Sequence, residues 1–363
     1  MTSPRRRIVL ALVALAWLGA GVVGAAAYVN RYVVYRGFPV PATPPGIARG
    51  TVREVSFHSQ ATGADSRYLV YLPPGYGRMA AHGRRFPVLY LLHGSPGRLT
   101  DFVDIGAVHV AANVLIAHHQ MPPMILVMPA GKTGSRFGAD TEWANTGAGR
   151  WMDYVLDVVG DVDRRFATIR DRRGRGLAGD SEGGFAAANI ALHHPDEFSV
   201  IESWAGYFTE TPTSVFKGAS AAALRANSPA AYVGALAPQI RRLGLRAWLY
   251  QGRVDVADPA ALRRFGSELH AAGADVHVAF FPGGHDWRLF RTRTPEMLAA
   301  AGRWFARDPR AGRPALHSTG RSLPLAVLRR RERERHARCL AIPAGAPVPG
   351  SCRHYRERIL GHA

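Results

Sequence analysis

The chain has 363 residues, which is enough for one large domain with appendages or for two ordinary domains, and 47% hydrophobic residues allow a sizeable core. The formal net charge of +19 lies mainly at the two ends. Residues 1–50 hold six arginines and no acid, and residues 306–363 hold thirteen arginines against four acids. The nearly neutral middle lacks a basic stripe with interleaved aromatics, which argues against a nucleic-acid-binding core.

The first thirty residues, 1–30, predict a membrane anchor. Three arginines at positions 5–7 precede residues 8–29, which carry no charged side chain. A helix of this length, at about 1.5 Å per residue, spans the roughly 30 Å hydrocarbon layer. We therefore expect a single-pass protein of the cell membrane with its remaining residues outside the cytoplasm. The alternative is a secreted protein with a cleaved signal peptide, since three alanines at positions 25–27 suit a peptidase.

Two irregular segments are predicted on either side of the central domain. Residues 31–50 are rich in proline and glycine and predict a stiff linker. Residues 307–363 form an Arg-rich tail, which we expect to be a solvated extension; the alternative is a short helix on an anionic membrane surface. Cys339 and Cys352 both lie in this tail, and they form a disulfide only if the tail is exported.

The central residues, 51–306, alternate between predicted strands and predicted helices. This alternation predicts an α/β fold with a mostly parallel central sheet and helices on both faces. Residues 132–150 are polar and glycine-rich, too long for a plain connection, and we expect them to form part of a binding rim. The expected strands are 52–57, 68–72, 86–92, 124–128, 200–205, 246–250 and 276–281, and the expected helices are 108–118, 151–166, 184–194, 259–272 and 295–305.

One pentapeptide, Gly179-Asp180-Ser181-Glu182-Gly183, indicates the chemistry. It fits the Gly-x-Ser-x-Gly nucleophile elbow, in which a strand turns sharply into a helix and exposes a serine at the apex. Glycines are needed two residues before and after the serine because the strand and the helix pass closely there. Ser181 is therefore the candidate nucleophile, and a helix N-cap is the alternative role.

A serine needs a base and a group that orients the base. Asp255 follows a predicted strand, and His285 lies on a glycine-rich loop after the last one. The order Ser181, Asp255, His285 is that of α/β-hydrolases. Asp258 is the alternative acid, although it also suits the N-cap of the helix that begins at Pro259.

The oxyanion of an acyl-transfer intermediate needs two N–H donors. We expect them from the backbone of Glu182 and of Ser95. Neither a metal nor another cofactor is expected, because no histidine or cysteine has ligand-like spacing. Several aromatic residues are candidates for an apolar substrate pocket, with an ordinary core role as the alternative; they are Trp143, Trp151, Tyr207, Phe208 and Trp287.

Residues 51–305 resemble the family of α/β-hydrolases that includes esterase D, feruloyl esterases and antigen 85 mycolyltransferases. The segments that carry the resemblance are 68–76, 86–94, 179–184 with 194–198, and 283–287. The resemblance implies Ser181 as nucleophile, His285 as base, Asp255 as acid, and Ser95 and Glu182 as oxyanion donors. Glu182 departs from the family, which often has methionine there, and this puts the substrate class in doubt.

These observations predict a membrane-anchored serine esterase that acts on a small-molecule or lipid ester outside the cytoplasm. An acyltransferase that uses the same acyl-enzyme is the second hypothesis. A non-catalytic protein that binds the cell envelope through its basic tail is the third.

Overall fold

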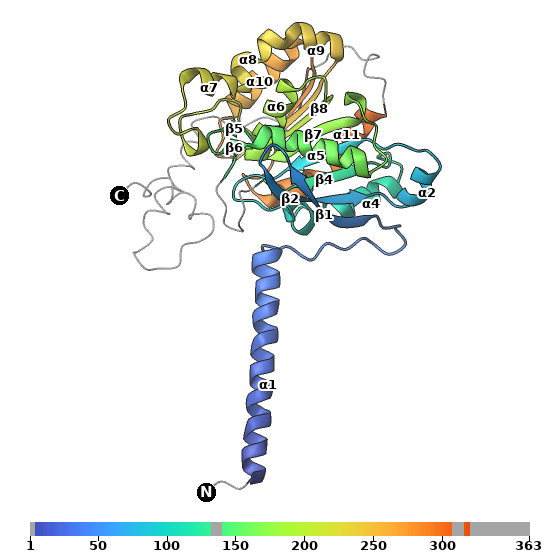
Figure 1. The fold of residues 1–363 in the computed structure, drawn as a ribbon, viewed down its shortest axis with the longest axis vertical. Coiled ribbons are helices and arrows are strands. Elements are labelled where there is room, and N and C mark those ends of the chain that lie inside the picture. Colours follow the sequence, from blue (N-terminus) through green and yellow to red (C-terminus); the bar gives the residue numbers. More distant parts are fainter. Residues whose placement is uncertain (1–3, 132–139, 307–315, 320–363) are drawn as a thin grey trace.

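A central sheet of nine strands forms the body of the computed structural model, which describes residues 4–131, 140–306 and 316–319 (Figure 1). The spatial order is β1-β2-β4-β3-β7-β8-β9-β10-β11. β2 runs antiparallel to β1 and β4, and all other neighbours are parallel. The strands are β1 (Thr51–Ser59), β2 (Ala64–Leu72), β3 (Val88–Leu92), β4 (Ile125–Pro129), β7 (Arg175–Asp180), β8 (Val200–Trp204), β9 (Arg246–Gly252), β10 (Asp275–Phe281) and β11 (Leu316–Thr319).

Helices cover both faces of this sheet, as predicted. α4 (Val108–Ala117) and α11 (Trp287–Phe305) pack on one face, and α5 (Trp151–Arg165), α6 (Glu182–His193) and α10 (Pro259–Ala272) pack on the other. The middle strands are buried throughout because both faces are covered. The result is the α/β-hydrolase fold. The short elements are α2 (Tyr76–Ala81), α3 (Asp101–Asp104), β5 (Asn145–Thr146), β6 (Gly149–Arg150), η2 (Arg172–Gly174), η3 (Ser214–Phe216) and η4 (Val233–Leu236).

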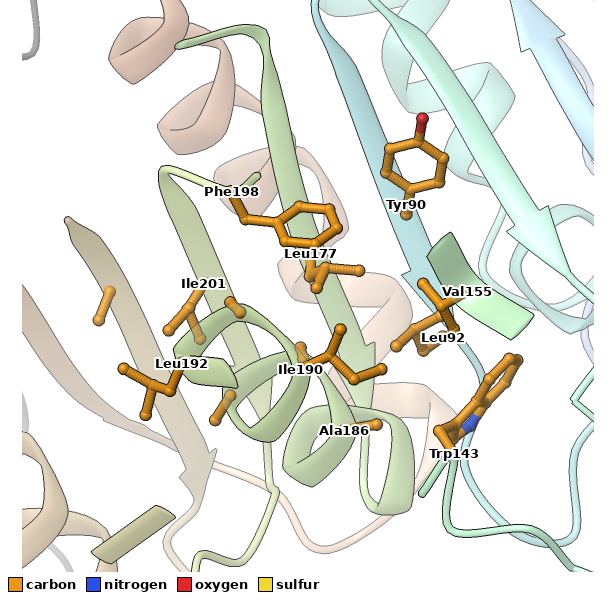
Figure 2. Close-up of a cluster of buried hydrophobic side chains, with 14 of the residues drawn as sticks. Tyr90, Leu92, Trp143, Val155, Leu177, Ala186, Ile190, Leu192, Phe198 and Ile201 are labelled. Carbon is orange, nitrogen blue, oxygen red and sulfur yellow. The ribbon is translucent and has the colours of Figure 1, made fainter. Parts of the chain in front are cut away.

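The core under α6 holds the nucleophile strand in place. Figure 2 shows Tyr90 and Leu92 of β3 and Leu177 of β7 facing Ala186 and Ile190 of α6. All five side chains are fully buried. The alternate residues Leu89 and Leu91 belong instead to the core on the opposite face. This alternation fixes the register of β3 and β7, and therefore the position of the turns that follow them.

The sequence missed or misplaced several helices. α11 begins at Trp287 rather than near residue 295, because the Asp286 carboxylate caps the helix by accepting hydrogen bonds from the N–H groups of Arg288 and Leu289. Three helices between β8 and β9 were not expected: α7 (Ala221–Ala226), α8 (Pro229–Tyr232) and α9 (Ala237–Leu243). Each has seven residues or fewer, too short for a helical period to show in the sequence.

The N-terminal apolar run is helical, and α1 (Pro4–Tyr28) projects away from the body (Figure 1). In the part of the chain that the structure describes, however, no helix is both long and apolar enough to cross a membrane. The membrane span predicted over residues 8–29 is therefore not supported. The structure does not describe the side chains up to residue 11. Within the described part of the helix, seven of the nine residues 19–27 are glycine or alanine, which offer little apolar surface to a membrane.

The predicted linker, residues 31–50, is bonded to the domain rather than free of it. The π-helical turn η1 (Val29–Val34) leads into Arg36, whose guanidinium donates to the buried carboxylate of Asp101 at 3.0 Å. Asn113 of α4 accepts a hydrogen bond from the N–H of Gly50 and donates one to Thr43. The linker therefore has a fixed course along the domain surface.

Three predictions concern residues outside the description. The tail helix over residues 323–335 and the pairing of Cys339 with Cys352 both lie there. So do residues 132–139 of the predicted rim, whereas residues 140–150 are described. Within the predicted tail, residues 316–319 form β11, which pairs in parallel with β10 at the edge of the sheet.

Candidate active site

The serine at position 181 lies at a sharp turn between β7 and α6. Its backbone has φ 54° and ψ −116°, a conformation that L-residues rarely adopt. A Cβ at Gly179 would overlap the backbone of Gly183, and a Cβ at Gly183 would overlap the carbonyl oxygen of Leu92. The two glycines are therefore required for the reason predicted, since the strand, the helix and β3 meet there without room for side chains.

A histidine and an aspartate come together across two loops. Nδ1 of His285 lies 3.0 Å from Oδ1 and 3.1 Å from Oδ2 of Asp255, which is buried in the turn after β9. Asp258, the alternative acid, accepts a hydrogen bond from the N–H of Ala260 at 2.8 Å and caps α10. Of the two acids, the structure thus pairs Asp255 with His285.

This pairing sets the charge and orientation of the imidazole. Desolvation of His285 opposes its protonated form, but the hydrogen bond and negative charge of Asp255 outweigh it and raise the pKa of His285 above its usual value, with help from Asp180 and Asp286. Because Nδ1 is hydrogen-bonded to Asp255, the other ring nitrogen, Nε2, can accept a proton from another group. The turns after β7, β9 and β10 lie at the carboxyl edge of the same sheet, and this edge therefore carries Ser181, Asp255 and His285.

The loop after β3 packs directly on the elbow. A Cβ at Gly94 would lie 2.9 Å from the Cβ of Ser181 and 2.8 Å from atoms of Asp180. The N–H of Gly94 donates to Oδ1 of Asp180 at 3.2 Å. Ser95 comes next and is half-buried. The loop therefore holds Gly94, the residue before Ser95, against the elbow, and the Ser95 N–H stays the predicted oxyanion donor.

The second predicted donor, the N–H of Glu182, is the first of α6. The N–H groups of Gly184 and Phe185 both donate to the carbonyl oxygen of Ser181, at 2.9 and 3.1 Å. Glu182 has no intrahelical acceptor at this position. Its N–H thus lies at the positive end of the helix, where a developing oxyanion is stabilised.

Trp143, a candidate for the substrate pocket, is fully buried and contacts the oxyanion loop instead. Its Nε1 donates to the carbonyl oxygen of His93 at 3.1 Å, and its ring packs edge-on against the His93 imidazole. Nε2 of His93 in turn accepts a hydrogen bond from the N–H of Gly131. Trp143 is therefore not part of an open substrate pocket. Its contacts instead support the chain at His93, just before Ser95.

We expect Trp143→Phe to lower kcat about 10-fold without a change of fold. Phenylalanine keeps an aromatic ring but removes the hydrogen bond from Nε1 to the buried carbonyl oxygen of His93, which costs about 1–2 kcal/mol and loosens the loop. The measurement is kcat and KM for p-nitrophenyl acetate, together with Tm. An unchanged kcat would show that the loop needs no support from this indole.

Trp287 remains beside the predicted base. It is half-buried at the start of α11, two residues after His285, and its ring packs edge-on against Phe102 and Phe290. Of the other aromatic candidates, Trp151 and Phe208 are buried in the core, and Tyr207 is half-buried.

Asp180, the residue before the serine, contacts the oxyanion loop in a way that the sequence did not indicate. Asp180 is 5% exposed. Burial, with a further contribution from the charge of Asp101, raises its pKa to about 7. Its place within the pentapeptide was the only available signal, because the contact with Gly94 joins residues 86 positions apart.

Asp180→Asn should therefore remove part of the pH dependence of stability. The folded chain keeps a proton that the unfolded chain releases near pH 4, so this group lowers the unfolding free energy progressively between pH 4 and 7. Between pH 4 and pH 8 we expect the free energy of unfolding of the variant to rise by about 2–4 kcal/mol relative to that of wild type. Urea unfolding at both pH values measures this difference, and equal values at both would contradict it.

A serine on a strand–turn–helix elbow, beside a paired histidine and aspartate on a mostly parallel sheet, defines the α/β-hydrolase class. Residues 59–301 match the model of the family described as putative esterase, and the chain belongs to that family. This match confirms the family resemblance seen in the sequence. Among the described residues, no group of three or more histidine, cysteine or acidic side chains is arranged to hold a metal ion.

Similar proteins include several esterases. The chain is 33% identical over 155 residues to an endo-1,4-beta-xylanase/feruloyl esterase of Xylanibacter ruminicola, covering 42% of this chain and 21% of that protein. It is 28% identical over 155 residues to an esterase of Mycobacterium tuberculosis, covering 41% of this chain and 31% of that one. It is 26% identical over 258 residues to the MPT51 antigen of Mycobacterium leprae, covering 61% and 82%. The chain thus spans less than a third of the first two relatives.

Solved structures share the fold. A ferulic acid esterase has a TM-score of 0.62 at 21% identity, covering 71% of this chain and 99% of its own. An S-formylglutathione hydrolase from Agrobacterium tumefaciens has a TM-score of 0.59 at 16% identity, covering 74% and 100%. At these identities the likeness establishes the architecture alone.

Proposed function

We propose that this protein is a serine esterase that hydrolyses carboxylic esters through an acyl-enzyme, with Ser181 as nucleophile, His285 as base and Asp255 as the acid that orients it. The observation that carries the proposal is the His285–Asp255 pair beside a serine in a strained elbow. Membership of the esterase family supports it.

The proposed reaction uses these groups in two steps. Nε2 of His285 accepts the Ser181 proton as Oγ attacks the ester carbonyl, and the N–H groups of Ser95 and Glu182 stabilise the oxyanion. Collapse of this intermediate expels the alcohol, which takes the proton from His285 and leaves an acyl-serine. Water then attacks the acyl carbon and gives a proton to His285. The carboxylic acid leaves and Ser181 recovers its proton.

Covalent labelling of the full chain tests this function. We expect a fluorophosphonate to label the protein, peptide mass spectrometry to place the adduct on Ser181, and p-nitrophenyl esters to be turned over with an optimum acyl length. Labelling without turnover would favour the acyltransferase hypothesis, since the same acyl-enzyme then waits for an alcohol. The absence of both labelling and turnover would overturn the proposed enzymatic function and favour a binding protein.

We also propose that the domain works outside the cytoplasm. The support is the arginine triplet at positions 5–7 ahead of an uncharged helical segment with exposed large side chains, such as Leu15, Trp17 and Leu18, the pattern of a secretion signal. A periplasm-dependent reporter such as alkaline phosphatase, fused after residue 50, should be active. An inactive fusion would place the domain in the cytoplasm.

A further inference from the structure

Four carboxyl groups interact with one another, and one of them belongs to the residue directly after the nucleophile. Glu182 follows Ser181 directly, and Asp140 and Glu142 come from the loop before β5; the charges of these two act on Glu182. Glu210, in the loop after β8, is acted on by Glu142. These side chains come from three separate parts of the chain and from no common motif. We call them the acidic cluster.

Two oxygens of the acidic cluster are buried without a hydrogen-bond partner. Glu182 is 4% exposed, and its Oε2 has none; Oε1 of the half-buried Glu210 also has none. Burial, followed by the charges of neighbouring carboxylates, raises the pKa of Glu182 well above its usual range and that of Glu210 to about 8. Buried acceptors of this kind are costly unless a donor satisfies them.

Some other buried acids of this arginine-rich chain have arginine partners, whereas the buried Asp180 and Glu202 form no such ion pair among the described residues. Asp101 pairs with two arginines, at positions 36 and 98, and Asp161 pairs with two more, at positions 164 and 165. Among the residues that the structure describes, by contrast, no arginine or lysine forms an ion pair with Glu182 or Glu210. Neither carboxyl group thus has a described arginine or lysine as its ion-pair partner.

An aromatic ring adjoins the acidic cluster. The hydroxyl of Tyr207 donates to Glu142, and its ring stacks on Phe185 of α6 with the centroids 5.0 Å apart. Tyr207, Glu142 and Glu210 are all half-buried, so the cluster reaches the solvent. Carboxylates together with an aromatic ring face are the groups that proteins use to bind organic ammonium ions.

We propose that the acidic cluster is a subsite for an organic cation, an ammonium or guanidinium group carried by the acyl or the alcohol part of the ester substrate. This inference rests on the proposed esterase function. An organic cation fits better than a metal ion, because the described side chains contain no metal-binding arrangement. It would supply the missing donors to Glu182 and Glu210 and offset the repulsion among the four groups.

Matched ester pairs test the subsite with the full chain. Acetylthiocholine and 3,3-dimethylbutyl thioacetate have nearly the same shape and differ in the charge of the alcohol part. p-Nitrophenyl 6-aminohexanoate and p-nitrophenyl heptanoate differ in the charge of the acyl part. We expect kcat/KM to favour the cationic member of at least one pair by about 10- to 100-fold. A ratio near one or below in both pairs would overturn the proposal.

Three variants test whether the acidic cluster causes the preference for cationic esters. Glu182→Gln keeps the backbone N–H and removes one carboxyl group of the cluster, and Glu210→Gln removes another. The matched control is Glu54→Gln, because Glu54 is an exposed residue of the edge strand β1. We expect the cationic-to-neutral ratio to fall about 5- to 30-fold in the first two variants and to stay constant in the control. A ratio retained in both cluster variants would refute the subsite.

A binding measurement separates this inference from the proposed function. If neither neutral ester is hydrolysed, the esterase function fails, and the subsite is then tested by calorimetric titration of the full chain with choline chloride at fixed ionic strength. Saturable binding that weakens at least 5-fold in Glu182→Gln would support the cation subsite. No binding, or equal binding by the variant, would reject it.

Discussion

Replacing Asp255 with asparagine should lower kcat for a p-nitrophenyl ester about 10³- to 10⁴-fold while the protein stays folded. The carboxylate accepts the Nδ1 proton of His285 through two close oxygens. An asparagine amide presents a donor on one side, favours the wrong imidazole tautomer and removes the charge that stabilises the imidazolium. KM should change much less than kcat, because Asp255 does not contact the substrate.

Asp258→Asn provides the matched control. It removes the same charge three residues away, where the side chain caps α10 through the N–H of Ala260. Asparagine is also a good N-cap, so we expect a stability change within about 1 kcal/mol and less than a 3-fold change in kcat. A larger loss of kcat in Asp258→Asn than in Asp255→Asn would reverse the assignment of the acid.

The pH profile gives a second measure of the same pair. His285 acts as a base only when it is neutral, so kcat/KM rises with pH as the ring loses its proton. Asp255 raises the pKa of His285, whereas desolvation lowers it. In Asp255→Asn only desolvation and more distant charges remain, so the rising limb should move to lower pH. A limb that stays in place would show that Asp255 does not set the histidine pKa.

The parts of the site that sequence could predict are those in which neighbours along the chain set the geometry. The elbow around Ser181 is local, because the two glycines and the strand-to-helix turn lie within five residues. His285 was predictable from its glycine-rich loop after a strand. The choice of Asp255 over Asp258 was left open, since it depends on which carboxylate faces a residue about thirty positions away.

The rest depends on contacts between distant segments. Trp143 has an apolar ring and one N–H donor, which suit a pocket wall as well as a buried hydrogen bond. The sequence cannot show that this donor bonds to His93, 50 residues earlier. The acidic cluster joins residues 140–142, 182 and 210, which no spacing rule connects. The fold class was predictable for the opposite reason. Alternating buried strands and amphipathic helices determine a parallel sheet whatever the details of the loops.

The elbow glycine at position 183 should be intolerant of even one methyl group. We expect Gly183→Ala to lower the free energy of unfolding by about 3 kcal/mol or more, because its Cβ would overlap backbone atoms of Leu92 that cannot rotate away. The strain falls on the end of β3, just before the loop that carries Ser95. Turnover should therefore fall as well, even below the unfolding temperature. Urea unfolding and kcat at 25 °C measure the two effects.

Gly77→Ala separates this steric effect from the general cost of replacing glycine. Gly77 lies in α2 with no atom within 4 Å of its would-be Cβ, and its backbone needs no positive φ. Alanine is the better helix former, so stability should rise or stay level within about 1 kcal/mol, with kcat unchanged. If Gly183→Ala behaved in the same way, β3 and α6 would have room to separate. In that case, contacts other than the close approach of Leu92 to the elbow would have to hold the Ser95 loop against Ser181.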